Sequence, residues 1–289
     1  MESVLSLNHV TKKYKDFCLK DVELTIPPGM IFGIIGENGA GKTTTIKAVL
    51  DMIKIDSGEI KILGKDYRKC VREVKQEIGV VMDGIGQNPY LYCKDLDSIF
   101  KRIYKNWNSE RYFSLLERFD LPGDKKIKEL SKGMNVKLNF AVAMAYDPKL
   151  LILDEATSGL DPVMRDEILE VLQEFVIDGG KSVLMSTHIT SDLDKIADYI
   201  VFIHKGRLKF IKSKEDIDNN YGVLHCRKAF FDALAPADYD AYIREEFSYK
   251  VLLNNKYETM EHFKDLTVDK ASIDDIMLFY IKGEHVCED

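Results

Sequence analysis

The sequence predicts an α/β fold with a mainly parallel sheet, and three observations support this prediction. Short apolar stretches such as IFGII (31–35) and LLILD (150–154) alternate with helical patterns, as strand–helix–strand units do. A glycine-rich segment follows the first of these stretches and leads into a helical pattern at 42–53. Residues 3–30 instead alternate like paired strands and end in a Pro-Pro-Gly turn, which indicates an antiparallel β part at the N-terminus.

The later elements continue this alternation, with one interruption. EIKILG (59–64) and IGVVMD (78–83) are predicted strands, and the pattern from about Leu96 to Ala145 becomes helical and polar. Strands and helices then alternate again from LLILD to IVFIHKG (200–206). This order predicts a parallel sheet interrupted by a helical insertion at about residues 88–145.

The last part of the chain has a different character. GVLHC and YKVLLNN are typical of strands, and ASIDDIMLFYIKG is typical of a helix. This helix is predicted by a capping box between Ser272 and Asp275, an apolar stripe, and Gly283 as its stop. We therefore expect residues 1–215 to form one domain and residues 216–289 a small α/β accessory domain that contains no recognisable motif.

Composition and charge narrow the classes of function. The chain has 289 residues, of which 45% are hydrophobic and 31% charged, so it can form a packed core. Its net charge of −7 argues against a general nucleic-acid-binding surface. No stretch approaches the roughly 18 apolar residues of a membrane span, and the N-terminus becomes polar at Asn8, which disfavours a signal peptide. We expect a cytoplasmic protein that reaches the membrane only through a partner.

The cysteines indicate neither a disulfide framework nor a zinc site. Their number is odd, they are widely spaced, and no CxxC pair occurs. Free thiols in a reducing compartment are the simpler interpretation. The positions are Cys18, Cys70, Cys93, Cys226 and Cys287.

The glycine-rich segment GENGAGKTT matches the phosphate-binding pattern G-x-x-x-x-G-K-[ST]. It lies between a predicted strand and a predicted helix, which is the context that the pattern requires. Its backbone N–H groups and the helix N-terminus can surround phosphates, Lys42 can reach the β- and γ-phosphates, and Thr43 can coordinate Mg²⁺. The sequence therefore predicts a P-loop that binds a nucleotide together with Mg²⁺. The residues expected to contact the nucleotide here are Gly36, Glu37, Asn38, Gly39, Ala40, Gly41, Lys42, Thr43 and Thr44.

Two carboxylates follow the most apolar predicted strand. In LLILDEATSGLD, Asp154 and Glu155 emerge at the carboxyl end of the strand, where ligands of α/β proteins bind. Asp154 is the expected partner of Mg²⁺, through water. Glu155 is the expected general base, which would polarise the attacking water.

Five short segments, in order, resemble the ATPase subunits of ATP-binding cassette (ABC) transporters. They are GENGAGKTT, LSKGM, LLILDE, SGLD and STH, and the resemblance covers residues 3–215. It implies that Ser131 and Gly133 occupy the signature motif, whose serine and helix N-terminus cap the γ-phosphate bound by another subunit. A dimer is therefore required.

The signature segment departs from the family pattern L-S-G-G-Q at two positions. Lys132 replaces the first glycine and Met134 replaces the glutamine. Lys132 can add positive charge near the phosphates of the partner subunit or point to solvent, and we favour solvent. Ser-Lys-Gly-Met resembles variants of the ABC-2-type export branch.

The resemblance assigns roles to further residues. Tyr14 matches the aromatic residue that stacks on adenine. The SGLD segment, which ends at Asp161, matches the loop that crosses the dimer interface beside the nucleotide. His188 matches the switch histidine, which contacts the γ-phosphate and, with Lys42 and Glu155, completes the expected catalytic set.

The glutamine loop of the family has no clear match. Asp83 stands where the family has a glutamine that touches Mg²⁺ and couples to the membrane subunit. A carboxylate oxygen can also bind a hard cation, and we favour Asp83 for this place. Gln87, four residues later, is the alternative.

Together these features predict an ATPase subunit that dimerises around two ATP·Mg²⁺ and drives a separate membrane permease, with export as the expected direction. The dimer can be a homodimer or a pseudo-symmetric heterodimer, on the inner face of the membrane, without nucleic acid. The helical insertion is expected to contact the permease. A non-transport ABC ATPase acting on ribosomes or DNA, and a P-loop kinase, are the competing hypotheses.

Overall fold

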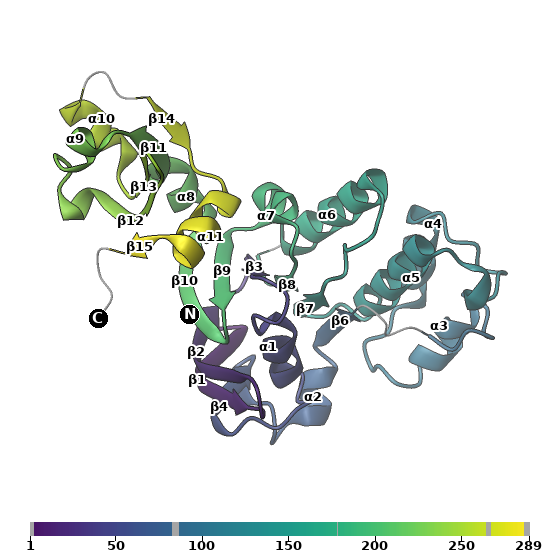
Figure 1. The fold of residues 1–289 in the computed structure, drawn as a ribbon. Coiled ribbons are helices and arrows are strands. Elements are labelled where there is room, and N and C mark those ends of the chain that lie inside the picture. The colour runs from purple at the N-terminus through teal and green to yellow at the C-terminus, as the bar shows by residue number, and fades with distance from the viewer. Residues whose placement is uncertain (1–2, 83–86, 178, 264–266, 286–289) are drawn as a thin grey trace.

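A six-stranded, mainly parallel sheet forms the centre of the protein. The computed structural model describes residues 3–82, 87–177, 179–263 and 267–285, and its strands lie in the order β10-β9-β3-β8-β7-β6 (Figure 1). Only the β9–β10 pair is antiparallel in this sheet. The predicted fold class is thus confirmed. The strands are β3 (Ile31–Ile35), β6 (Ile78–Met82), β7 (Leu150–Asp154), β8 (Ser182–Ser186), β9 (Tyr199–His204) and β10 (Arg207–Ser213).

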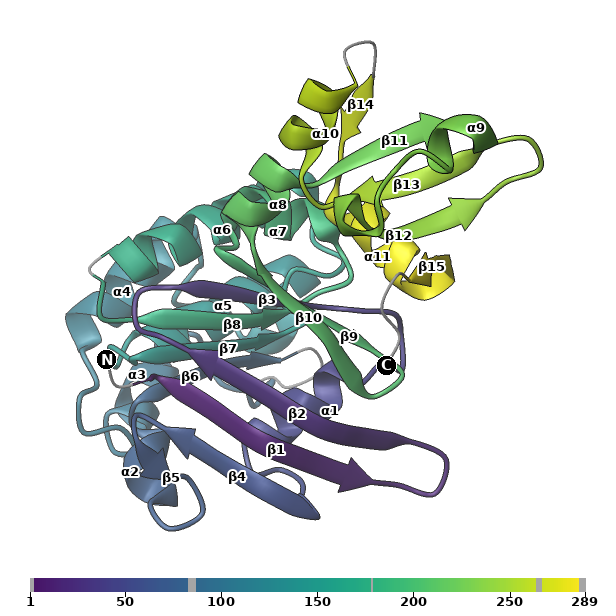
Figure 2. The ribbon, with the colours of Figure 1, turned by 90° about the vertical axis from the view of Figure 1, so that its left-hand side faces the viewer.

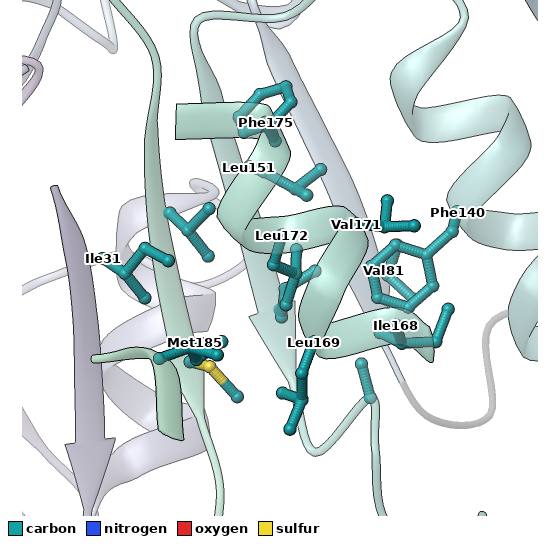
Figure 3. Packing of buried hydrophobic residues seen from close by; sticks show 14 of the residues in the cluster. Ile31, Val81, Phe140, Leu151, Ile168, Leu169, Val171, Leu172, Phe175 and Met185 are labelled. Atoms are coloured by element: carbon teal, nitrogen blue, oxygen red, sulfur yellow. The ribbon is translucent and has the colours of Figure 1, made fainter. Parts of the chain in front are cut away.

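Both faces of this sheet are covered, which explains the continuous apolar runs of its strands. On one face, side chains of α6 (Pro162–Ile177) pack over β7 and β8, and α7 (Thr190–Ile196) continues this layer (Figure 3). On the other face lie α1 (Lys42–Val49) and the N-terminal β-sheet. Alternation along β7 divides its side chains between the faces, because Leu151 and Leu153 join the first core and Leu150 and Ile152 the second.

The N-terminal part forms an antiparallel sheet in the order β2-β1-β4-β5, as its alternating pattern predicted (Figure 2). The turn between β1 and β2 contains Tyr14, the residue that is expected to stack on adenine. A short helix, α2 (Val71–Lys75), leads from this sheet to β6. The strands are β1 (Leu5–Lys13), β2 (Cys18–Ile26), β4 (Ser57–Ile62) and β5 (Lys65–Asp66).

The predicted helical insertion lies between β6 and β7. Its core includes Tyr112, Phe119 and Phe140, which are buried, whereas Phe113 of the same region is 45% exposed. An ion pair between the buried Lys137 ammonium and Glu167, 2.7 Å apart, links the insertion to α6. The elements are α3 (Asp95–Phe100), α4 (Ser109–Arg118), the 3₁₀ helix η1 (Ile127–Glu129) and α5 (Lys132–Met144).

The C-terminal part adds an antiparallel five-stranded sheet in the order β14-β11-β13-β12-β15. The domain boundary at 215/216 remains a prediction, and it falls inside α8 (Lys214–Asn220). The last helix, α11 (Ile273–Lys282), has the predicted capping box and ends at Gly283. The other elements are β11 (Gly222–Cys226), α9 (Lys228–Phe231), η2 (Pro236–Asp238), β12 (Tyr239–Arg244), β13 (Tyr249–Leu253), α10 (Lys256–His262), β14 (Val268–Lys270) and β15 (Glu284–His285).

Candidate functional site

A cleft of about 740 Å³ opens where α1 begins. Its walls combine the glycine-rich loop, the turn between β1 and β2, and the segments that follow β7 and β8. Parallel strands all direct their carboxyl ends to this edge of the sheet, so their loops meet here. The lining residues are Tyr14, Asp16, Phe17, Glu37, Asn38, Gly39, Gly41, Lys42, Thr43, Thr44, Glu155, Ser158 and His188.

Two glycines shape the glycine-rich loop. A Cβ atom at Gly36 would lie 2.2 Å from the carbonyl oxygen of Ile203, so a side chain does not fit beside this strand. Gly41 precedes α1 with a φ angle of 119°, a conformation that other residues rarely adopt. The first turn of α1 contains no acidic residue, so the positive end of the helix dipole is left for an external anion. The loop therefore has the shape and polarity of a phosphate site.

Lys42 is the first residue of α1 and folds back over the loop. Its Nζ donates hydrogen bonds to the carbonyl oxygens of Gly36, at 2.7 Å, and Glu37, at 3.4 Å. The Lys42 Nζ also lies 3.5 Å from Glu155 Oε1, and the Lys42 side chain is only 5% exposed. This buried ammonium can exchange these carbonyl contacts for phosphate oxygens.

Asp154 ends β7 and points to the same face of the sheet as Leu150 and Ile152, toward α1. Its Oδ1 accepts a hydrogen bond from Thr43 Oγ1 at 3.2 Å and a second from Ser186 Oγ at 2.5 Å. These oxygens suit a hard cation such as Mg²⁺. The described residues contain no group of three or more His, Cys, Asp or Glu side chains that could hold a metal alone. Water and phosphate oxygens would complete the coordination shell.

Glu155 connects the two ends of the cleft. Its backbone has a φ angle of 52°, in the left-handed region, and its N–H donates to the carbonyl of Ser186 at 3.0 Å. One carboxylate oxygen, Oε1, faces Lys42, and the other, Oε2, lies 2.6 Å from His188 Nδ1. The predicted catalytic residues Lys42, Glu155 and His188 thus lie together, although 33 positions separate the last two.

Tyr14 lies at the rim of the cleft with 47% of its surface exposed. An exposed tyrosine ring at this place can stack on a nucleotide base. Phe17 lines the same cleft, and its ring approaches Gly41 so closely that a Cβ there would lie 3.1 Å from it. Sequence analysis missed Phe17. Its spacing of three residues from Tyr14 within a short turn was the available signal, and Asp16 between them was missed as well.

Ser131 and Gly133 lie apart from this cleft. Neither is among the described residues that line it. Ser131 is exposed and caps α5, accepting a hydrogen bond from the Met134 N–H at 3.1 Å. Gly133 packs so closely against Met164 that a Cβ atom would lie 2.5 Å from its sulfur. Within one chain, therefore, the signature segment contributes nothing to the wall of the cleft.

Asp161 also has a local structural partner. Its Oδ1 accepts hydrogen bonds from the N–H groups of Val163, at 3.1 Å, and Met164, at 3.0 Å, at the start of α6. Lys132 is exposed, and its ammonium lies 3.0 Å from where a Cβ of Gly159 would be. The Lys132 side chain thus extends along the SGLD segment. Neither Asp161 nor Lys132 is among the described lining residues.

Of the two residues predicted for the glutamine loop, Asp83 and Gln87, only Gln87 is among the described residues. Asp83 lies outside the described residues. Gln87 is partly buried and is not among the described residues that line the cleft. The assignment of this position thus stays a prediction.

A buried carboxylate behind the cleft was missed by sequence analysis. Asp192 of α7 accepts a hydrogen bond from Thr157 Oγ1 at 2.8 Å and lies 3.9 Å from Arg165 Nε. Burial raises the pKa of Asp192 above its ordinary value, while the hydrogen bond from Thr157 opposes this change. Asp192 thus joins α7 to the segment that carries Glu155. The SDLDKI segment alone does not show which of its acidic residues points inward.

A histidine lies behind the glycine-rich loop. Burial lowers the pKa of His204, and the Glu37 carboxylate, 3.5 Å from its Nδ1, acts in the opposite direction. This Nδ1 is one of the buried atoms without a hydrogen-bond partner among the described residues. Since the pKa is lowered, His204 is neutral near pH 7 and adds no positive charge to the loop.

The fold and this arrangement define a P-loop ATPase. The family model described as ABC transporter matches residues 19–158. The chain is 33% identical over 77% of its length to the Nod factor export ATP-binding protein I of Cupriavidus metallidurans (strain ATCC 43123 / DSM 2839 / NBRC 102507 / CH34), of which 75% is covered. This protein therefore belongs to the ATP-binding, ATP-hydrolysing subunits of ABC transporters.

Two further similarities differ in how much of the chain they cover. The bacitracin transport ATP-binding protein BcrA of Enterococcus faecalis is 28% identical over 94% of this chain and 84% of its own length. A solved ATP-binding subunit of an ABC transporter has a TM-score of 0.69 at 27% identity, over 74% of this chain and 92% of its own. The similarity to BcrA therefore extends into the C-terminal part. Among the described residues, no helix has the length and apolarity that crossing a membrane requires.

Proposed function

We propose that this ATPase subunit binds two ATP·Mg²⁺ between two copies of itself, or between itself and a similar subunit, and drives a separate membrane permease. The observation that carries this proposal is a divided site. The cleft is lined by Lys42, Glu155 and His188. Asp154 lies behind its wall, bonded to Thr43, whereas Ser131 caps an exposed helix start outside the cleft. A second copy can supply that helix start to the open side of the cleft.

The glycine-rich loop and Lys42 bind the phosphates, and Tyr14 provides a face for the adenine. Thr43 and Asp154 would hold Mg²⁺, with Asp83 or Gln87 as a further ligand, and the ion when bound would supply positive charge beside the phosphates. The short Ser186–Asp154 hydrogen bond keeps the carboxylate oriented toward Thr43.

Glu155 accepts the proton of the attacking water as general base. Its position between Lys42 and His188 supports this role, because the two contacts restrict the rotamers of its side chain and hold its carboxylate at the cleft. His188 holds Glu155 and the γ-phosphate in one arrangement. Ser131 and Gly133 of the other subunit close the phosphate site from the opposite side, with Asp161 at the same interface.

The permease docks at the junction of the central sheet and the helical insertion. A groove of about 220 Å³ lies there beside β6, which is an edge strand. Met52 is 51% exposed and Val80 36% exposed, so the groove offers apolar surface that the described residues leave uncovered. We infer that a short helix of the permease occupies it. The lining residues are Leu50, Met52, Tyr67, Lys75, Ile78, Val80, Met82 and Tyr104.

Export is the direction that we propose, on the inner face of the cell membrane. The name of the Nod factor relative refers to export, and that of BcrA to bacitracin transport. The Ser-Lys-Gly-Met segment also supports export, because it resembles variants of the ABC-2-type export branch. The cargo itself contacts the permease, so no residue of this chain identifies it.

The test of the catalytic proposal is a Glu155→Gln variant. We expect it to bind ATP normally, to hydrolyse it at least about 100-fold more slowly, and to accumulate as a closed dimer with ATP. Steady-state phosphate release, equilibrium binding and light scattering measure these properties. Glu170→Gln on the exposed side of α6 is the matched control and should behave like the wild type. Wild-type turnover in Glu155→Gln would exclude Glu155 as the base.

A further inference from the structure

The switch segment 187–189, which carries His188, is held firmly on its strand side. Thr187 is buried, and its N–H donates to the carbonyl of Ile34 at 3.1 Å. Its hydroxyl accepts a hydrogen bond from the Ile189 N–H at 3.0 Å. His188 itself is exposed, and its Nδ1 lies 2.6 Å from Glu155 Oε2. The position of His188 therefore depends on how both ends of this short segment are fixed.

On the other side the segment leads directly into α7. Ile189 provides no side-chain cap for this helix, which begins at Thr190. Along its inner face, α7 buries Leu193 and Ile196 in the main core and directs Asp192 to Thr157. A small rotation of α7 would therefore move both His188 and the segment after Glu155.

The outer side of α7 contacts the C-terminal part of the chain. Figures 1 and 2 show α11 beside α7, and the two helices are in contact. Asp274, in the first turn of α11, accepts a hydrogen bond from Thr190 Oγ1 at 2.9 Å, across 84 positions of sequence. Ile273, Ile276 and Phe279 of α11 are buried in the same core as α7. The last helix is thus attached to the central domain at the element that follows His188.

We propose that Asp274 is a positioning residue for ATP hydrolysis. It acts through Thr190 and the start of α7 and keeps His188 in contact with Glu155. The C-terminal part, to which the sequence assigned no role, then sets the rate of hydrolysis without touching the nucleotide. This inference rests on the proposed role of His188 and Glu155, and it adds a residue from outside the cleft.

The apolar contact and the hydrogen bond have different roles in this arrangement. The buried face of α11 holds the helix on the domain, because apolar burial is strong but not directional. The Thr190–Asp274 hydrogen bond is exposed and contributes little to stability, but it fixes the orientation of one helix start relative to the other. Loss of this bond should therefore change catalysis more than folding.

The test uses the full chain with Asp274→Ala, Thr190→Val and the double variant. We expect each single variant to lower kcat about three- to tenfold, the range that one hydrogen bond permits. The dissociation constant for ATP and the melting temperature should remain those of the wild type. Since both variants remove the same bond, the double variant should be no slower than the slower single variant.

Two controls separate positioning from a structural effect. Thr190→Ser keeps the hydroxyl group and should restore the wild-type kcat. Asp269→Ala removes an exposed aspartate of β14, in the same part of the chain, and should leave kcat unchanged. Losses that multiply in the double variant, equal losses in Thr190→Ser and Thr190→Val, or unchanged kcat in both single variants would each overturn the proposal.

The same assays distinguish failure of this inference from failure of the proposed function. If Glu155→Gln abolishes hydrolysis while Asp274→Ala leaves it unchanged, only the positioning role is wrong. If Glu155→Gln hydrolyses ATP normally, the catalytic assignment on which the inference rests is wrong. A parallel loss of ATP binding and melting temperature in Asp274→Ala would make Asp274 a structural residue instead.

Discussion

At the scale of single residues, the chemistry of the cleft depends on how β7 ends. Alternation along the strand directs Asp154 toward Thr43, and the left-handed backbone at Glu155 then turns the next carboxylate toward Lys42 and His188. Non-glycine residues in this region carry strain that surrounding contacts must hold, and such residues occur often at functional sites. Two adjacent acids thereby reach different partners.

Asp192 leads to a prediction about pH at the residue scale. Burial raises its pKa in the folded protein above the ordinary 3.8. Because the folded protein binds the Asp192 proton more tightly than the unfolded chain does, this proton stabilises the fold. The stabilisation is fully present below the ordinary pKa and is lost as pH rises through the folded-state pKa. Asp192→Asn has no titrating group here. We expect the stability of the wild type relative to Asp192→Asn to fall as pH increases across this range.

Urea unfolding of both proteins over a series of pH values measures this difference. Asp269→Asn, at an exposed position, is the control and should give no such slope. A difference between wild type and Asp192→Asn that is constant with pH, or that grows as pH increases, would contradict the assigned direction. The comparison uses differences between variants because other groups of the protein titrate in the same range.

At the scale of elements, the edge strand β6 and the helical insertion leave a groove open to a partner. Edge strands that remain exposed are common sites of association. The groove lies beside β6, whose last residue, Met82, pairs with Asp154 at the end of β7, so a helix bound in it would lie one strand away from Asp154. This arrangement offers a short route between the permease and the cleft.

We expect Met52→Glu and Val80→Glu to reduce co-purification with the permease, because a buried unpaired carboxylate disfavours binding. Both side chains are exposed, so basal ATP hydrolysis by the lone subunit should change less than about twofold. Ile177→Glu, at a position that is 75% exposed at the end of α6, is the matched control and should retain the permease. Retention by both groove variants would place the permease contact elsewhere.

At the scale of the whole molecule, the proposed function requires two copies for a complete site. In the proposed symmetric dimer, the glycine-rich loop of each copy would meet the Ser131 helix of the other, so that every site would be composite. The lone subunit should therefore hydrolyse ATP with a specific activity that increases with protein concentration. Slow hydrolysis that is independent of concentration would indicate a site completed within one chain.

Mixing two inactive variants tests this arrangement directly. Lys42→Ala removes the phosphate lysine, and Ser131→Arg blocks the signature helix. A mixed dimer has one intact composite site, so an equal mixture should recover about a quarter of wild-type activity if subunits exchange freely and sites act independently. Mixing Lys42→Ala with the Lys42→Ala/Ser131→Arg double variant leaves no intact site and is the control. No recovery in the first mixture would contradict the composite site.

Several features were predictable because few consecutive residues determine them. The glycine-rich loop, the buried strand before Asp154, and the capping box of Ser272 and Asp275 depend on backbone geometry and spacing within one turn or strand. The structure shows each of them at the predicted residues. The parallel direction of the central strands follows from the same alternation of strands and helices. Their order, in which β3 lies between β8 and β9, does not follow from it.

Other features became evident only in three dimensions. Three hydrogen bonds join residues that lie far apart in the sequence: Ser186 to Asp154, Thr157 to Asp192, and Thr190 to Asp274. Phe17 lines the cleft, but nothing in the sequence distinguishes it from its neighbours. An apolar stripe shows that one face of a helix will be buried, but many surfaces of similar hydrophobicity can cover it. The sequence by itself thus determined the glycine-rich loop before α1 and the two carboxylates, Asp154 and Glu155, at the end of β7. Only tertiary packing decided that α11 lies on α7, because the burial of apolar surface has no direction of its own.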